Sequence, residues 1–281
     1  MKSGPIASFV LAFILQLPFQ FPVCAQSFES LYQQGLTQVK MGDVSSAIGS
    51  FSMAAQLNPK SFAAQYNLGL ALRQSGQIQE SASAFYRAIQ LDPSYALTYA
   101  NLGTALLEGH NLKQSREYLS RAIVLDSTLG MAHYNLGLVQ NLEGDVKGAT
   151  NSFQKATELN PGIPEPYYHL GLAYQRTKWN RGSIAAFRKA VQVNPNYADA
   201  FYGLGTVLYS DGDWSNAIAA FRSATQLNPK FANAYYGAGM TLLKQKNYPE
   251  AKRVLEFAKT EYQRSGNRVW VDRVNGILSK I

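Results

Sequence analysis

The sequence has very little cysteine and histidine. Its 281 residues include one cysteine, Cys24, and three histidines. Cys24 lies in an N-terminal segment, residues 1–25, that we predict to be cleaved. The remaining chain would therefore hold no disulfide and no thiolate ligand for a metal. A chain without cysteine suits an oxidising compartment such as a periplasm.

The histidines do not form a site either. His110, His133 and His169 are never three or four residues apart, and no carboxylate cluster surrounds them. A zinc site needs three or four such ligands. The chain also lacks a phosphate-binding glycine loop and a nucleophile elbow. We therefore predict no metal, no cofactor and no catalytic residue, so that the protein is not an enzyme.

The N-terminal segment has the order of a secretory signal. Lys2 is the only charged residue before Glu29, and an apolar stretch follows over residues 6–17. The segment ends at Val23-Cys24-Ala25, which supplies small residues at the positions before the expected cleavage site. A positive start, a short apolar core and a small-x-small exit are the pattern that signal peptidase reads. We expect cleavage after Ala25 and export to the periplasm, an equivalent lumen or the outside.

Two alternatives for this segment stay open. An uncleaved membrane anchor needs about 20 apolar residues, and Gln16, Pro18 and Gln20 interrupt the run. A lipoprotein would be modified at Cys24, although Pro22 and Val23 stand where small residues are preferred.

The main chain carries a period of 34 residues, marked by a recurring Asn-Pro or Asp-Pro pair. The pair is incomplete in one repeat, where Asp126 is followed by Ser127 in place of the proline. Because the residue before a proline is pushed out of the helical region, each pair is expected to end a helix. With the proline at position 32, seven repeats follow without insertion or deletion: 28–61, 62–95, 96–129, 130–163, 164–197, 198–231 and 232–265.

Other positions recur in the same register. Position 8 is Gly and position 27 is Ala in all seven repeats, position 7 is Leu in five, and position 24 is Phe or Leu. This pattern resembles the tetratricopeptide repeat, of the exported bacterial type, over nearly the whole chain after residue 27. The resemblance implies an all-α fold, a right-handed α-solenoid of seven helix-turn-helix units.

The recurring small residues have a packing explanation. Glycine inside a helix costs about 0.5–1 kcal/mol relative to alanine, so it needs a compensating contact. We expect Gly at 8 and Ala at 20 and 27 to let the two helices of a repeat pack nearly backbone to backbone. After Ser265 the period stops. Residues 266–281 are then predicted to form a C-terminal capping helix, with Asn267 as its N-cap and Trp270 and Val274 on its apolar face.

In tetratricopeptide proteins the first helix of each repeat lines the concave surface, which implies a binding groove here. Position 5 is Tyr in six repeats and position 6 is Asn in three. The rings could grip an extended segment and the amides could bond its backbone. Both residues are also common in the family, so selectivity stays open. The groove residues are Tyr32, Tyr66, Asn67, Asn101, Tyr134, Asn135, Tyr168, His169, Tyr202 and Tyr236.

The net charge of +8 is concentrated at the C-terminal end, where residues 230–281 hold ten basic and four acidic residues. A positively charged patch attracts acidic proteins, anionic polymers or lipid headgroups. The alternative is that these charges only keep the terminal cap soluble. Nucleic acid is disfavoured for an exported protein. The candidate patch is Lys244, Lys246, Lys252, Arg253 and Lys259.

These observations favour a non-catalytic scaffold that binds extended segments of partner proteins in its concave groove. The alternative is binding of an anionic polymer or a membrane surface through the basic C-terminal repeats. The family's clamp for a terminal carboxylate needs Lys or Arg at positions 2 and 5 and Asn at 9. The chain has mostly Tyr at 5 and Leu at 9, so this recognition is disfavoured.

Overall fold

A computed structural model describes residues 27–281, which form fifteen α-helices and no strand. The predicted export signal lies outside the described residues. The all-α solenoid of seven helix pairs is confirmed, and the first helix of each pair begins at position 1 of the register. The pairs are α1 (Phe28–Lys40) with α2 (Val44–Leu57), α3 (Phe62–Gln74) with α4 (Ile78–Leu91), α5 (Ala96–Glu108) with α6 (Leu112–Leu125), α7 (Gly130–Leu142) with α8 (Val146–Leu159), α9 (Pro164–Arg176) with α10 (Asn180–Val193), α11 (Ala198–Asp211) with α12 (Trp214–Leu227), and α13 (Ala232–Lys244) with α14 (Tyr248–Arg264).

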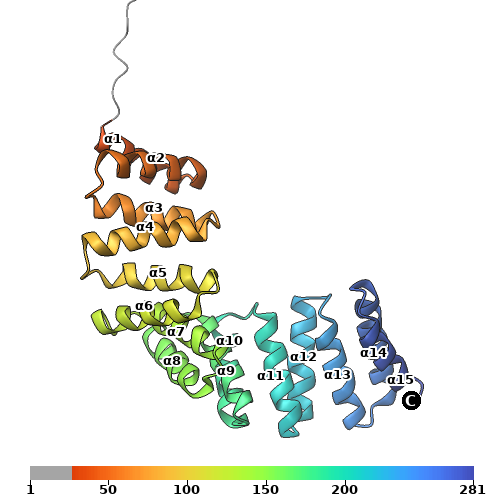
Figure 1. The fold of residues 1–281 in the computed structure, drawn as a ribbon. Helices are drawn as coiled ribbons and strands as arrows, with labels where there is room; N and C mark the ends of the chain where they lie inside the picture. The colour runs from red at the N-terminus through yellow and green to blue at the C-terminus, as the bar shows by residue number, and fades with distance from the viewer. Residues whose placement is uncertain (1–26) are drawn as a thin grey trace, which may run out of the picture.

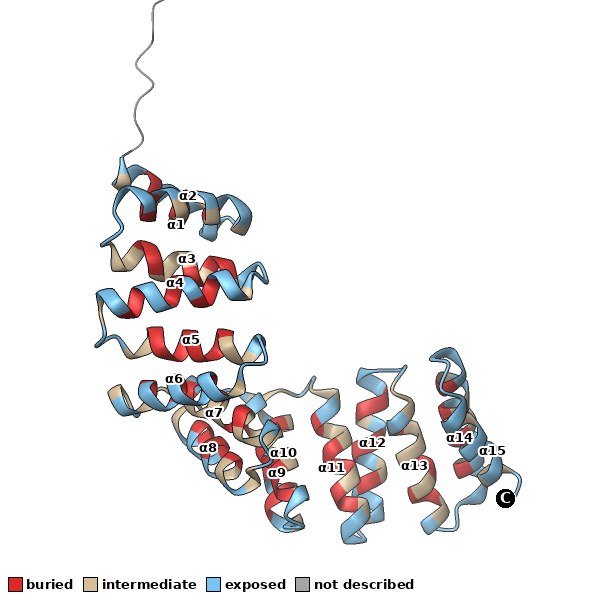
Figure 2. Cartoon of the chain, viewed as in Figure 1, coloured by how far each residue is buried: buried red, intermediate tan, exposed pale blue. Residues whose placement is uncertain are grey.

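The helices stack in chain order. Each helix packs on the helices before and after it, and first helices of adjacent repeats also touch, as α5 does α7 and α11 does α13. Figure 1 shows α1–α6 in one stack, a change of direction through α7–α10, and α11–α15 continuing at a steep angle to the start. Buried residues follow the facing sides of neighbouring helices along the whole array (Figure 2). The core is therefore a continuous seam, as stacking requires.

Inside each repeat, the glycine at position 8 lies against the side chain at position 24. A Cβ atom added to Gly137 would lie 2.7 Å from the Phe153 ring, and one added to Gly103 would lie 2.6 Å from Leu119. Phe153 is 1% exposed. The expectation of backbone-to-backbone packing was therefore wrong about the partner, because the glycine makes room mainly for a side chain and less for the facing backbone.

A hydrogen bond joins the same two helices in three repeats. Where position 20 is serine, its buried hydroxyl donates to the carbonyl oxygen of the position-8 glycine. The Oγ atoms of Ser81, Ser115 and Ser183 lie 2.8, 2.7 and 2.8 Å from those oxygens. A buried hydroxyl without a partner would be costly, so this bond is what makes serine acceptable beside the glycine.

The turn between the two helices of every repeat passes through the left-handed region at position 15. Glycine supplies this conformation in four repeats, while His110, Lys178 and Lys246 adopt it with φ of 60°, 59° and 61°. A left-handed conformation costs a non-glycine residue about 1–2 kcal/mol. In five of the seven repeats the N-cap side chain of the second helix, such as Asp43 or Asp145, accepts a backbone N–H.

The turn between repeats three and four forms without a proline. The Asp126 carboxylate accepts hydrogen bonds from the backbone N–H and the hydroxyl of Thr128, at 2.9 and 2.6 Å. Asp92 holds Ser94 in the same way. These bonds stabilise the charged form and lower the pKa of both carboxyls. The turns that have the proline make the same Asx bond, as Asn58 does with the backbone N–H of Lys60, so this bond forms whether or not the proline is present.

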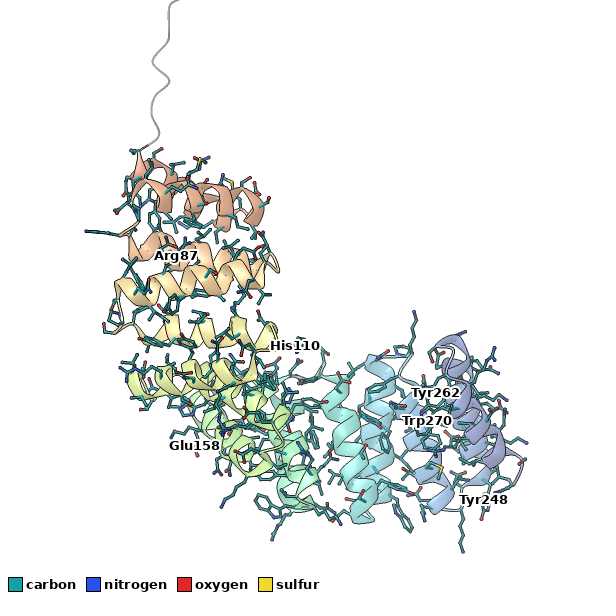
Figure 3. All side chains as sticks on the ribbon, in the orientation of Figure 1. Arg87, His110, Glu158, Tyr248, Tyr262 and Trp270 are labelled. Carbon is teal, nitrogen blue, oxygen red and sulfur yellow. The ribbon has the colours of Figure 1, made fainter. Side chains whose placement is uncertain are left out.

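The C-terminal end is closed by α15 (Arg268–Leu278), which is shorter than the predicted 266–281. Its N-cap is Asn267, as predicted, and Val274 is fully buried. The Trp270 ring stacks on Tyr262, with centroids 5.4 Å apart, and the two side chains lie together at this end (Figure 3). Ile281 lies beyond the helix and is exposed.

The contact between positions 8 and 24 yields a stability prediction with an internal control. We expect Gly137→Ala to destabilise the array by about 1–3 kcal/mol, because the added methyl overpacks the Phe153 ring. Gly49 also lies inside a helix, but no atom stands within 4 Å of its missing Cβ. Gly49→Ala should therefore stabilise by about 0.5–1 kcal/mol. Urea denaturation followed by circular dichroism measures both, and a Gly137→Ala chain as stable as wild type would contradict the packing argument.

Candidate binding groove

The predicted tyrosines form one row along the first helices, each half-buried. In the five repeats that have Phe at position 24, the tyrosine ring packs on that phenylalanine with centroids 5.8–6.0 Å apart. Repeat seven has Leu255 there instead, and Tyr236 packs on Trp270 of the cap at 5.0 Å. The structure thus brings the row together and holds each ring by its inner side.

The asparagines beside the row serve contacts between repeats. The Nδ2 atom of Asn67 donates to the Tyr32 hydroxyl at 3.0 Å and to a carbonyl of its own helix, and Asn101 Nδ2 donates to the Tyr66 hydroxyl at 3.1 Å. Asn135 faces Ala100, which has no hydroxyl, and donates instead to Thr104 at 2.7 Å.

This finding corrects the predicted role of the amides. Asn101 and Asn135 are 5% and 7% exposed. Asn67 is less buried, but its side-chain amide donates both of its hydrogen bonds to atoms of the protein itself. They lock each repeat to the one before it, and their N–H groups are not available to a bound segment. The sequence signal for this role was present in repeats two and three, since each of those amides stands 35 residues after its tyrosine.

The tyrosine hydroxyls divide the groove into two halves. Those of Tyr32 and Tyr66 accept the asparagine bonds. Within residues 27–281, the hydroxyls of Tyr134, Tyr168 and Tyr202 make no hydrogen bond, and the same holds for Tyr236. Burial raises the pKa of Tyr134 to about 12, with a further contribution from Glu165. The Tyr134 hydroxyl is therefore protonated at neutral pH, and a free tyrosine hydroxyl of this kind can donate to a carbonyl oxygen.

His169 stands at position 6 of repeat five, where the three preceding repeats have asparagine. Its ring stacks on Phe153, with centroids 5.5 Å apart, and meets the edge of Tyr134 at 5.7 Å. Burial lowers the pKa of His169, while the nearby Glu165 carboxylate raises it by less. His169 is therefore neutral at pH 7 and fills space between two repeats.

The predicted basic patch is partly neutralised by its own helix. On α14, Arg253 pairs with Glu250 and Lys259 with Glu256, each at 2.6 Å. In the described part of the chain Lys244, Lys246 and Lys252 make no ion pair. Because each pair cancels a positive charge locally, the field of the patch comes from three lysines around the α13–α14 turn.

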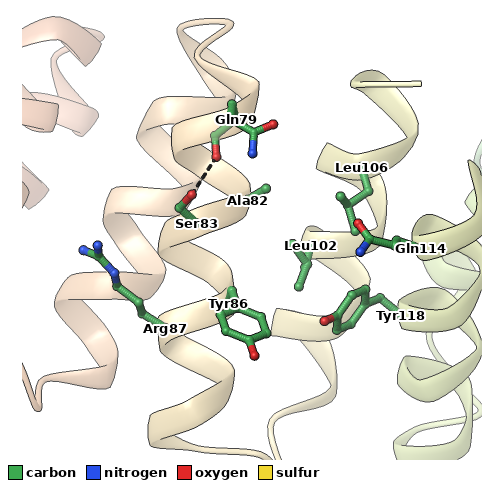
Figure 4. A pocket seen from close by; sticks show the side chains of 9 residues that line it. All are labelled: Gln79, Ala82, Ser83, Tyr86, Arg87, Leu102, Leu106, Gln114 and Tyr118. Atoms are coloured by element: carbon green, nitrogen blue, oxygen red, sulfur yellow. Dashed lines mark hydrogen bonds between the residues drawn. The ribbon is translucent and has the colours of Figure 1, made fainter. Parts of the chain in front are cut away.

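The outer face carries hollows that the sequence did not predict. One of about 580 Å³ lies between α4 and α6 over α5, with Tyr86 and Tyr118 facing each other across it and Leu102 and Leu106 behind (Figure 4). Similar hollows lie between α10 and the turn from α11 to α12, and between α12 and α14. Because the first-helix leucine at position 11 lines each of the three, they result from the repeat geometry.

Over residues 27–281, no three His, Cys, Asp or Glu side chains lie close enough together to hold a metal ion. In the same range, no helix has the length and apolar character needed to cross a bilayer.

Sequence profiles identify the family. The profile of the tetratricopeptide repeat matches residues 32–96, a second profile named TPR repeat matches 140–178, and that of anaphase-promoting complex, cyclosome, subunit 3 matches 180–258. These matches fall on the helix pairs described above. The chain is a tetratricopeptide repeat protein. No curated protein sequence matches it significantly.

Solved structures share the fold of this tetratricopeptide repeat protein. YrrB, described as a TPR protein with an unusual peptide-binding site, is 25% identical with a TM-score of 0.62, covering 69% of this chain and 99% of its own. PilF of Pseudomonas aeruginosa is 18% identical with a TM-score of 0.65, covering 74% and 94%. A tetratricopeptide repeat protein of Parabacteroides merdae is 19% identical with a TM-score of 0.63, covering 89% and 99%.

His169 predicts how stability depends on pH. Because the folded chain lowers the pKa of His169 below its ordinary value of 6.5, the unfolded chain binds the proton more readily. The contribution to stability is therefore complete above pH 6.5 and is lost as the pH falls below it. The variant His169→Asn should lose this acid sensitivity, because an asparagine amide takes up no proton in this pH range. Its amide can reach Tyr134 as Asn67 reaches Tyr32, so that the space between the repeats stays filled.

Denaturation midpoints at pH 7.5 and 5.0 measure the effect. The difference between the two midpoints should be smaller in His169→Asn than in wild type, with His133→Asn as the control for a histidine outside the groove row. An unchanged difference in His169→Asn would assign the acid sensitivity to other groups.

Proposed function

We propose that this protein is a non-catalytic scaffold that binds extended segments of partner proteins in its concave groove. The observation that supports it is the row of half-buried tyrosines with free hydroxyls in repeats four to seven. Rings whose inner sides are already packed lose little conformational entropy on binding, and their hydroxyls can bond a peptide backbone. Tetratricopeptide repeat proteins are in general non-catalytic and bind other proteins.

The binding half of the groove is the C-terminal half. In repeats one and two the hydroxyls of Tyr32 and Tyr66 already accept bonds from the protein's own amides. A ligand there would have to displace those bonds, whereas Tyr134 and Tyr168 have no such competitor. YrrB, which has the same fold, is described as having a peptide-binding site, and this is consistent with such a use of the groove.

The alternative, binding of an anionic polymer or membrane surface by the basic C-terminal repeats, has less support. Two of its five cations, Arg253 and Lys259, are paired with carboxylates one turn away. Exposed pairs of this kind contribute little to stability, but they remove charge from the surface that such a ligand would meet.

A pair of matched variants tests the groove. We expect Tyr134→Phe with Tyr168→Phe to weaken partner binding about tenfold or more, because each lost hydrogen bond is worth about 0.5–1.5 kcal/mol. The control, Tyr32→Phe with Tyr66→Phe, removes two hydroxyls that face asparagines and should keep the same partners. Affinity capture from envelope extract with quantitative mass spectrometry compares them. Equal capture by both double variants and wild type would refute the groove.

We also propose that the protein is exported, on the basis of the signal-like order of residues 1–25. The expected mature N-terminus is Gln26. N-terminal sequencing of the protein purified from an envelope fraction checks this, and Ala25→Arg should block cleavage as the control. A mature chain that still carries Lys2 would favour the anchor alternative, and a lipid on Cys24 the lipoprotein.

A further inference from the structure

Position 6 changes character along the groove. It is asparagine in repeats two to four, His169 in repeat five, and glycine at Gly203 and Gly237 in repeats six and seven. The asparagines and the histidine each fill the space toward the preceding repeat. The glycines put no side chain there, so the gap between Tyr202 and Gly237 has nothing corresponding to the Asn67–Tyr32 bond.

These glycines are required by the packing below them. A Cβ atom on Gly203 would lie 2.7 Å from the Phe187 ring, and one on Gly237 would lie 2.6 Å from Phe221. Each of these two phenylalanines is therefore enclosed between two glycines, the second being at position 8 of its own repeat. The ring of Phe221 forms the floor of the space that a larger residue at 237 would have occupied.

A cavity of about 300 Å³ lies at this place, between α11 and α13, and we name it the tyrosine pocket. Its apolar wall is made by the rings of Tyr202, Tyr236 and Phe221 and by Met240. Polar atoms stand at its edge: the Asn233 side chain, whose Oδ1 accepts from Tyr262, and the Thr206 hydroxyl, which donates to its own helix. The remaining lining residues are Tyr209 and Gly237.

Two carboxylates stand on the groove face before the pocket, toward the middle repeats, and neither of them lines it. Asp199 precedes Tyr202 by three residues on α11, and Glu165 precedes Tyr168 by three on α9, so each lies on the groove face of its helix. Both are exposed, and neither makes an ion pair within the described residues. Their charge raises the pKa of nearby tyrosine hydroxyls, after burial as the main cause, which places them beside the row.

Three cations of this region stand away from these two carboxylates, and a fourth, Lys230, lies in the turn before α13. Lys244 stands at the far end of α13, Arg176 at the far end of α9 donates to Asn141, and Arg273 lies over the Trp270 ring at 4.5 Å. The rim beside Tyr168 and Tyr202 is therefore negative.

We propose that the tyrosine pocket receives one large apolar side chain of an extended partner segment, and that Asp199 and Glu165 pair with a basic residue of the same segment. This proposal rests on the groove function proposed above and specifies its ligand as a peptide with an apolar anchor and a neighbouring Lys or Arg. The pocket supplies aromatic contact for the anchor, and the rim hydroxyls and amide supply bonds to the peptide backbone.

The test uses a phage-displayed library of random dodecapeptides selected on the immobilised protein. Wild type should enrich peptides that share a Phe, Leu or Met together with a Lys or Arg a few residues away. Thr206→Leu fills the pocket with the residue that four other repeats carry at this position, so it is expected to fold. It should lower the affinity of the most enriched peptide at least tenfold in fluorescence anisotropy.

Matched variants separate the contributions. Ser210→Leu adds the same side chain one turn further along α11, outside the pocket, and should bind the peptide within about twofold of wild type. Asp199→Asn with Glu165→Gln should lose the preference for Lys and Arg while keeping the apolar anchor. Met240→Phe narrows the pocket from the other wall and replaces Thr206→Leu should that variant not fold.

The outcomes distinguish the two proposals. Enriched peptides without a shared apolar residue, or a peptide whose affinity is unchanged by both pocket variants, would overturn the tyrosine pocket but leave the groove as the binding surface. Failure to enrich any peptide would overturn the groove function, and the pocket with it. Enrichment that depends on the apolar residue alone would remove the role of Asp199 and Glu165.

Discussion

The contact between a glycine at position 8 and a large side chain at position 24 is the one on which every repeat depends. Gly137 has no Cβ atom, and the ring of Phe153 lies only 2.7 Å from the point where that atom would stand. The ring can pack this closely only because the residue is glycine. The cost of a glycine within a helix is about 0.5–1 kcal/mol. Burying a phenylalanine side chain returns about 1.5–3 kcal/mol. Repeating this exchange in each unit makes the stack stable without any single large core.

The groove is a consequence of the same contact. A phenylalanine that packs on glycine from one side presents its other side to the tyrosine at position 5, which is why Tyr134 lies on Phe153 and Tyr202 on Phe221 at nearly the same distance. The rings of the row are therefore oriented by the core before any ligand arrives. Position 6 then differs between repeats, and it divides the groove into a bonded N-terminal half and an open C-terminal half.

Much of the fold could be predicted from the sequence because it depends on local, repeated chemistry. The Asn-Pro and Asp-Pro pairs marked the helix ends, and the register placed helix starts at Phe28, Phe62 and each later repeat. Asn267 was recognisable as an N-cap from its position. The left-handed turn at position 15 was missed because His110, Lys178 and Lys246 interrupt its glycine pattern.

The sequence by itself determined the period, the helix pairs and the presence of a tyrosine row, since these follow from the spacing of residue types along the chain. The tertiary structure alone decided which polar groups remain free. Asn67 and Tyr32 are 35 residues apart and bond only because adjacent repeats stack at one distance. The same stacking leaves Tyr202 opposite Gly237, where there is no amide. A hydrogen bond or a pocket between repeats depends on that spacing in three dimensions, which residue types alone do not specify.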